Sequence, residues 1–165
     1  MEIVSARFPL CRAISKSLSI TEGSNVYEFV YKGITYRLSV PKHFIFDGAS
    51  IPRIAWGILG LTPHGAMDGP ALPHDFCYHY RGDFPPGCYW IADVHGNWRV
   101  CRVPMSKEMS DELLKVLCIH FNVCGSFKAS LVWTGVKWFG SSAWNSEDED
   151  RKDLLLAHEN GECNA

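Results

Sequence analysis

The stretch LPHDFCYHY, residues 72–80, decides how this chain of 165 residues is expected to fold and act. Pro73 suits the first position of a helix, where the N–H that proline lacks would have no partner in any case. We therefore predict a helix that begins at Pro73 and carries His74 and Asp75 in its first turn. The positive end of the helix dipole there favours an ionised Asp75 and a neutral imidazole on His74.

A neutral imidazole beside a carboxylate that can hold a metal is what a water-activating general base needs. The same dipeptide has a purely structural interpretation, in which Asp75 caps the start of a helix and His74 lies at the surface. Zinc is the less favoured metal, because no pair of histidines here has the HxxxH or HExxH spacing that presents two imidazoles on one helix face.

A second candidate site lies upstream, in the loop FDGASIPR, residues 46–53. In a tight turn, Asp47 and Gly48 would bring a carboxylate and backbone carbonyls together, and calcium binds oxygen ligands of this kind. The alternative is an Asx turn that leads into a short helix. Arg53, at the end of the loop, and Trp56, just beyond it, are predicted to contact a substrate.

Downstream, Ser106 predicts the N-cap of a helix that runs to about Phe121. Four apolar residues recur on one face of this helix: Met109, Leu113, Leu117 and Phe121. Asp111 lies at the edge of that face, from which its carboxylate could reach the imidazole of another helix and fix its tautomer. The alternative is an acid in the first turn that only complements the helix dipole. A further helix is predicted over residues 127–139, ending at Gly140.

Alternating apolar and polar residues predict two β-hairpins, one around Lys32-Gly33 and one around His95-Gly96. Their strands are expected at residues 25–31 and 34–40, and at 89–94 and 97–103. The predicted fold is therefore α+β: a small helical core of three main helices, with two β-hairpins attached.

We expect one globular domain over residues 1–144. It comprises an N-terminal segment with the first hairpin, residues 1–40, and a core, residues 41–144, with the second hairpin inserted at 88–103. Residues 145–165 contain seven acidic and two basic residues and are predicted to form an acidic tail.

The composition narrows the classes of protein to consider. The chain is 47% hydrophobic and 13% aromatic, which supplies a buried core and excludes disorder over the whole length. Sixteen Lys and Arg balance eighteen Asp and Glu, and no basic stretch suggests a nucleic-acid partner. No signal peptide and no run of about 20 apolar residues is visible, so we expect a soluble protein made in the cytoplasm. Seven irregularly spaced cysteines favour free thiols.

Four motifs occur in the order FDGASIPR, ALPHDFCY, SDELLKVLC and VWTGVKWFGSSAW. Together they resemble DUF1353, a family of phage and prophage proteins of unknown function, over about residues 41–144. The resemblance implies a phage setting, with synthesis in the cytoplasm of the host and association with the virion as a further expectation.

The order of loop, HDxxY helix and helical Asp is also similar to that in phospholipases of the A2 type. This second resemblance implies a similar pairing of helices, with His74 as the general base, Asp111 orienting it and Tyr78 bracing the site. It further implies calcium, with Asp75, Asp47 and Gly48 as ligands.

Two functions therefore stand side by side. The first is a small hydrolase that cleaves phospholipids or other esters, acting on the host membrane. The alternative is a non-enzymatic virion, tail-associated or host-interaction protein, in which the His–Asp cluster is structural and the partner is a virion or host protein. A metal-dependent peptidoglycan or amide hydrolase fits the phage setting but lacks the ligand spacing.

Overall fold

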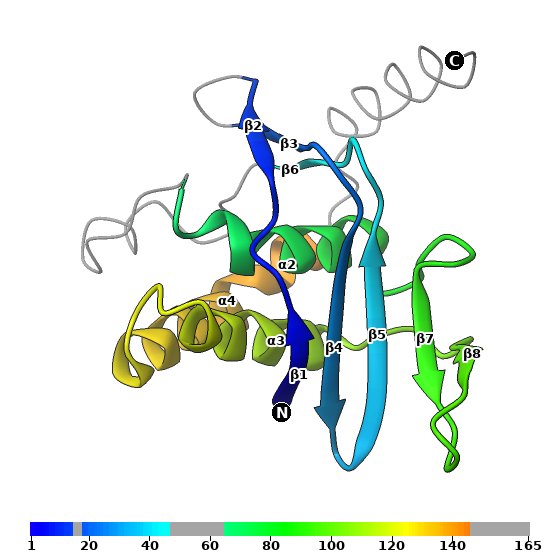
Figure 1. Cartoon of the computed structure of the whole chain (residues 1–165). Coiled ribbons are helices and arrows are strands. Elements are labelled where there is room, and N and C mark those ends of the chain that lie inside the picture. The colour runs from blue at the N-terminus through cyan, green and yellow to red at the C-terminus, as the bar shows by residue number, and fades with distance from the viewer. Residues whose placement is uncertain (15–17, 47–64, 146–165) are drawn as a thin grey trace.

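A five-stranded antiparallel sheet forms one layer of the computed structural model, and three helices lie behind it (Figure 1). The structure describes residues 1–14, 18–46 and 65–145. The sheet has the order β1-β4-β5-β7-β8, with β1 Glu2–Ala6, β4 Asn25–Tyr31, β5 Ile34–Val40, β7 Tyr89–Ala92 and β8 Trp98–Val100. A smaller sheet has the order β2-β3-β6, with β2 Cys11–Ala13, β3 Ser19–Thr21 and β6 Ile45–Phe46. The described helices are α2 Asp68–Tyr80, α3 Lys107–His120 and α4 Ser126–Asn145. The α+β class is thus confirmed.

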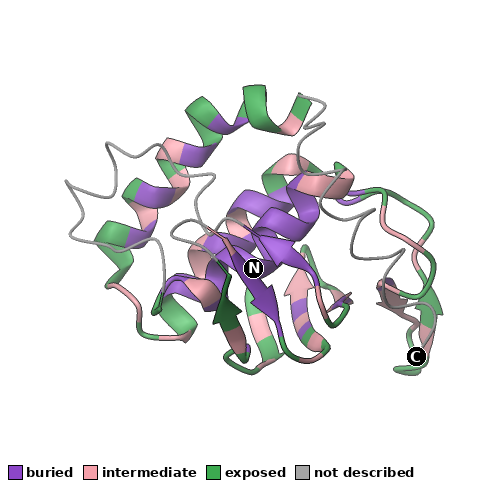
Figure 2. Ribbon diagram, turned by 90° about the horizontal axis from the view of Figure 1, so that it is seen from above, coloured by how far each residue is buried: buried purple, intermediate pink, exposed green. Residues whose placement is uncertain are grey.

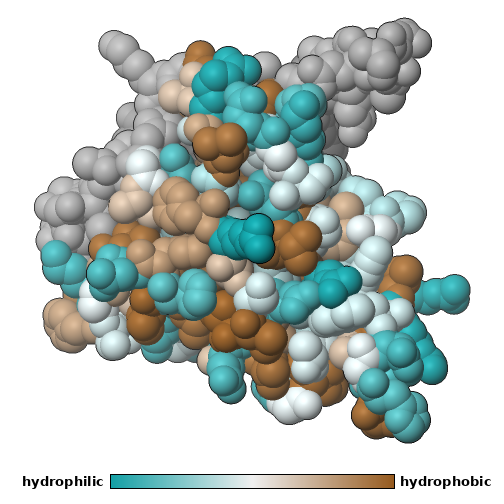
Figure 3. All heavy atoms as spheres, in the orientation of Figure 1, coloured by the Kyte–Doolittle hydropathy of each residue, from teal (hydrophilic) through white to brown (hydrophobic). Residues whose placement is uncertain are grey.

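The first predicted hairpin forms as expected. Strands β4 and β5 pair in continuous register from Asn25 opposite Val40 to Tyr31 opposite Ile34. Lys32 and Gly33 both have positive φ angles, 50° and 79°, as a two-residue turn of the primed type requires. The side chains that point to the helices are fully buried: Tyr27, Phe29, Leu38 and Val40. The opposite face of the sheet carries a mixture of polar and apolar side chains (Figure 3).

The second hairpin was expected as an insertion attached to the helical core, whereas the structure makes it part of the main sheet. Strand β7 pairs with β5, from Tyr36 opposite Ile91 to Leu38 opposite Tyr89, so both hairpins form one sheet. Strand β1 extends the same sheet on the other side of β4. The paired residues are 21 to 28 positions apart along the chain for β1 and β4, and 51 to 55 positions apart for β5 and β7. Periodicity in the sequence predicts individual strands but not which strands pair across such separations.

Helix α2 packs against the large sheet and against α3, and every residue from Gly69 to Tyr78 is buried. It begins at Asp68, so Pro73 lies inside it and not at its first position, contrary to the prediction. A helix that is buried all round has no polar face, and its sequence therefore has no helical periodicity to mark its start. The placement of His74 and Asp75 in the first turn was wrong for the same reason.

Helix α3 begins where the sequence predicted, with the Ser106 side chain accepting a hydrogen bond from the backbone N–H of Met109 at 3.2 Å. Helix α4 continues through Gly140 to Asn145, so the predicted end at Gly140 was wrong. Gly140 is buried against another helix and does not terminate its own. From above, α4 is the outermost layer, with α2 and α3 between it and the sheet (Figure 2). None of the described helices combines the length and apolar character that crossing a bilayer requires.

The end of α2 is locked to the start of α3 at Gly82. Arg81 and Gly82 have positive φ angles, and their N–H groups bond to the carbonyls of Tyr78 and Cys77. The carbonyl of Gly82 in turn accepts a hydrogen bond from the N–H of Met105 at 3.0 Å. A Cβ atom on Gly82 would collide with the carbonyl oxygen of Met105. Only glycine satisfies both the backbone angle and this close approach.

We predict that Gly82→Ala lowers the free energy of unfolding by about 2 kcal/mol or more, because the φ strain adds to the collision with Met105. Gly96→Ala is the matched control: Gly96 also has a positive φ, 82°, but a Cβ there meets no atom within 4 Å. Urea denaturation of both variants measures the difference. Equal losses in the two variants would contradict the close-packing argument.

Candidate functional site

Three polar side chains from α2 and α3 meet at the buried carboxylate of Asp111. Nε2 of His74 lies 3.3 Å from Oδ1 of Asp111, and the hydroxyl of Tyr78 donates to the same oxygen at 2.7 Å. Nζ of Lys107 donates to the other oxygen, Oδ2, at 2.7 Å. His74 and Tyr78 lie one helical turn apart on α2, and Lys107 and Asp111 one turn apart on α3, so each helix presents its pair on one face. We call these four residues the Asp111 cluster.

His74 and Asp111 are shielded from solvent, and hydrogen bonds between charged or polar groups are stronger where water is excluded. His74 is 2% exposed and Asp111 is 1% exposed. Burial by itself raises the pKa of Asp111, but the bonds from His74, Lys107 and Tyr78 outweigh it and hold that pKa below its ordinary value. Asp111 is therefore ionised, and an ionised carboxylate only accepts hydrogen bonds. Nε2 of His74 consequently carries a proton.

The other ring nitrogen of His74 faces a second acid. Nδ1 lies 3.7 Å from Oδ1 of Asp75, which is also buried. Burial by itself lowers the pKa of His74, but the bond with Asp111 and the neighbouring Asp75 outweigh it and raise that pKa above its ordinary value. Of the two nitrogens, Nδ1 is the one available to lose or gain a proton, because Nε2 is committed to Asp111.

Helix α4 closes the cluster from outside through its backbone. The carbonyl of Val136 accepts a hydrogen bond from Nζ of Lys107 at 3.0 Å. Gly140 lies directly against Tyr78, where a Cβ atom would meet the phenolic oxygen. The ring of Trp144 packs edge-on against Tyr78, with centroids 5.0 Å apart. Three helices therefore depend on one another through Tyr78 and Lys107.

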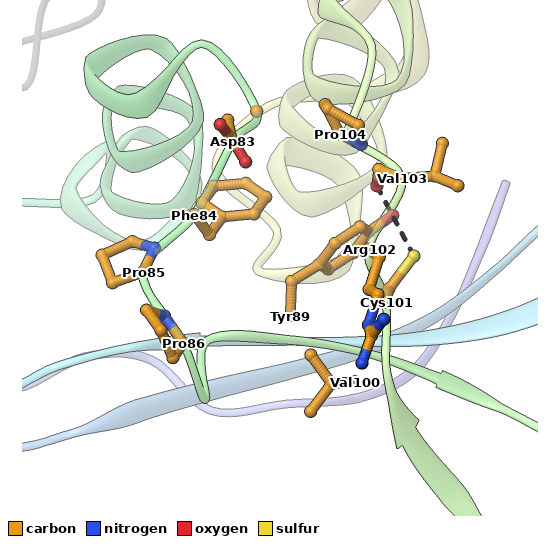
Figure 4. Close-up of a pocket in the computed structure, with 11 residues that line it drawn as sticks. Asp83, Phe84, Pro85, Pro86, Tyr89, Val100, Cys101, Arg102, Val103 and Pro104 are labelled. Atoms are coloured by element: carbon orange, nitrogen blue, oxygen red, sulfur yellow. Dashed lines mark hydrogen bonds between the residues drawn. The ribbon is translucent and has the colours of Figure 1, made fainter.

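A hollow of about 350 Å³ borders the cluster on the side of Asp111. Its lining comes from α3 and α4: Lys107, Glu108, Asp111, Trp133, Lys137 and Ser141. A second hollow of about 260 Å³ lies between the end of α2 and β8, with Phe84, Tyr89 and Arg102 in its lining (Figure 4). None of the residues that line this second hollow belongs to the Asp111 cluster.

The structure brings together four of the residues that the sequence singled out, namely His74, Asp75, Tyr78 and Asp111. The other four predicted site residues lie outside the described residues: Asp47, Gly48, Arg53 and Trp56. The sequence analysis missed Lys107, although its spacing of four residues from Asp111 on a helix is a recognisable ion-pair signal. The backbone contacts of α4 at Val136 and Gly140 leave no such signal.

A calcium site has to be assessed from the donors present. Both oxygens of Asp111 accept hydrogen bonds from donors, so Asp111 is not placed to serve as a cation ligand. Within the described residues, no three His, Cys, Asp or Glu side chains are grouped so as to hold a metal ion. Calcium takes six to eight oxygen ligands, so a site at Asp75 needs carbonyl, hydroxyl or water oxygens in addition to that carboxylate.

The fold and the cluster define an α+β protein whose three described helices converge on a buried carboxylate with three hydrogen-bond donors. A family model matches residues 25–136, from β4 to the middle of α4. The chain belongs to this family, which is described as "Protein of unknown function (DUF1353)". Comparison with curated proteins and with solved structures gives no match.

We predict that Gly140→Ala destabilises the protein by about 1–3 kcal/mol, because the added methyl group displaces the Tyr78 hydroxyl from Asp111. Gly135→Ala is the control on the same helix: a Cβ there meets nothing within 4 Å. It should be stabilising by up to about 1 kcal/mol through helix propensity alone. Thermal and urea denaturation measure both, and the same sign of change in the two variants would contradict the prediction.

Proposed function

We propose that the Asp111 cluster is the catalytic centre of a small hydrolase that cleaves esters, with phospholipids as the substrate class. The observation that supports this most is the contact of 3.3 Å between Nε2 of His74 and Oδ1 of Asp111. A carboxylate that holds one ring nitrogen fixes the tautomer and leaves the other nitrogen as the base. The setting we propose is that of a phage protein acting on the membrane of its host.

In the proposed reaction, Nδ1 of His74 takes a proton from a water molecule as the water oxygen attacks the ester carbonyl. The imidazolium formed is stabilised by Asp111, which keeps its negative charge. When the tetrahedral intermediate breaks down, the C–O bond to the leaving alcohol breaks and Nδ1 returns the proton to the alkoxide. The hydroxyl of Tyr78 and the ammonium of Lys107 hold Asp111 in place and do not contact the reacting atoms in this scheme.

Calcium is the cofactor we propose for this reaction. Asp75 would supply one carboxylate, and Asp47 and the backbone of Gly48 would supply further oxygens. When bound, the cation would polarise the ester carbonyl and stabilise its developing negative charge.

A second candidate function is favoured by the burial of His74, of which only 2% is exposed. A buried imidazole between two carboxylates can serve purely to join helices, since satisfied polar networks hold a unique arrangement of packed elements. In that case the protein would be a non-enzymatic virion or host-interaction protein. Loss of the cluster would then lower stability and have no catalytic consequence.

Assays of ester hydrolysis on chromogenic esters and on phosphatidylglycerol vesicles test the first proposal. His74→Gln is expected to lower kcat/KM at least 100-fold, since general-base catalysis contributes about 10²–10⁴-fold. The base must be neutral, so kcat/KM should rise with pH through a pKa above the ordinary value of histidine. Asp111→Asn removes the charge that raises this pKa and should move the profile to lower pH.

Tyr78→Phe serves as the matched variant, because it removes one hydroxyl that donates to Asp111 and leaves the imidazole of His74 in place. We expect it to keep its fold by circular dichroism and to lose less activity than His74→Gln. A folded His74→Gln protein with unchanged turnover would overturn the hydrolase proposal. No activity on any ester, together with a lower melting temperature of His74→Gln, would favour the structural role.

Calorimetric titration tests the cofactor separately from activity. Chelator-treated protein should bind calcium, and Asp75→Asn should abolish this binding because it removes the charged ligand oxygen. Asp83→Asn, which alters an acid outside the cluster, is the control and should bind as the parent does. Equal binding by the Asp75→Asn protein would contradict the proposed ligand.

A further inference from the structure

Helix α4 is apolar on two opposite sides. Its inner side is buried against the other helices and consists of Ala129, Val132, Val136 and Gly140. On the opposite side lie Phe127, Leu131 and Trp138, which are 77%, 43% and 76% exposed. Their spacing of four and seven residues places them within about 40° of one another around the helix, at 100° per residue. We call these three residues the outer stripe.

The outer stripe lies on the outermost layer of the molecule. Figure 2 shows the outer surface of α4 as largely exposed, with its buried residues turned toward α2 and α3. Phe139, which follows Trp138 in the chain but lies about 100° further around the helix, is also 70% exposed. Large apolar side chains grouped on one exposed helix face are typical of surfaces that contact a partner or a membrane.

The charges around the outer stripe indicate which kind of partner fits. Between Glu112 and Glu147 the sequence contains no Asp or Glu, whereas it contains three lysines, Lys115, Lys128 and Lys137. Lys128 and Lys137 adjoin the stripe residues Phe127 and Trp138 in the chain, and both lysines are exposed. Helix α4 therefore carries aromatic residues and lysines and no acidic residue. A second copy of the chain would bring lysines against lysines across such a surface.

We propose that α4 lies along the surface of an anionic lipid bilayer, with the outer stripe inserted among the headgroups. Lysines at the edges of an aromatic stripe are placed to contact lipid phosphates, as in helices that bind in the plane of the interface. The helix has 20 residues, so about 30 Å of its length is available for this contact. Its inner side remains packed on α3, so docking requires no unfolding.

This inference goes beyond the proposed hydrolase, because it rests on α4 alone and holds whether or not the Asp111 cluster is catalytic. The two are also spatially compatible. Lys137 borders both the outer stripe and the hollow beside Asp111. A bilayer docked on α4 would therefore lie next to that hollow.

Co-sedimentation with vesicles of ether-linked lipids tests the proposal, because ether lipids have no ester bond to hydrolyse. The intact chain should bind vesicles that contain phosphatidylglycerol ether and should bind pure phosphatidylcholine ether at least tenfold more weakly. Combined replacement of the stripe by Phe127→Ser, Leu131→Ser and Trp138→Ser should weaken binding more than tenfold. Each apolar side chain that leaves water for the bilayer contributes to the free energy of binding. Lys128→Gln with Lys137→Gln should weaken binding and remove its dependence on salt.

The matched control replaces exposed valines elsewhere, Val94→Ser and Val103→Ser, which should leave vesicle binding unchanged. Circular dichroism and melting temperature verify that each variant is folded. Absence of binding by the parent chain, or full binding by the folded triple variant, would overturn the proposal. A parent chain that is dimeric by analytical ultracentrifugation, together with a monomeric triple variant, would also overturn it, since the outer stripe would then contact a second copy of the chain. Loss of ester hydrolysis with retained vesicle binding would overturn only the hydrolase.

Discussion

The buried carboxylate of Asp111 is the constraint on which the helical layer depends. A charge removed from water is costly unless donors surround it, and here three donors do so from two helices. Replacing any one donor would leave part of that charge unsatisfied on a side chain that is only 1% exposed. The packing of α2 on α3 is therefore held by a specific geometry in addition to apolar contact.

Helix α4 is tied to the same point in a different way. It contributes no side chain to Asp111, yet its backbone accepts a bond from Lys107 at Val136 and its Gly140 lies against Tyr78. Any shift of α4 would thus change the position of two donors at once. A contact on the exposed outer side of α4 would therefore act on the same helices that hold His74 and Asp111.

The two ring nitrogens of His74 have different roles: one holds the ring in place, and the other carries the proposed chemistry. Its Nε2 faces Asp111 and its Nδ1 faces Asp75. The first contact fixes the ring whatever the protein does. Nδ1, which faces Asp75, is the nitrogen whose protonation responds to pH. It acts as the base in the hydrolytic proposal and has no catalytic role in the structural one.

The sequence by itself determined the α+β class, the first hairpin and the capped start of α3, because each follows from a local pattern of alternation, turn residues or capping. It also singled out His74 and Asp111, whose contact was one of two alternatives for the edge of the apolar face of α3, and Tyr78, whose role came only from a resemblance. Tertiary structure alone decided that α2 begins at Asp68, that the second hairpin joins the first in one sheet, and that the backbone of α4 closes the cluster at Val136 and Gly140. These features arise from burial on all sides and from contacts between distant segments, and neither leaves a periodic signal along the chain.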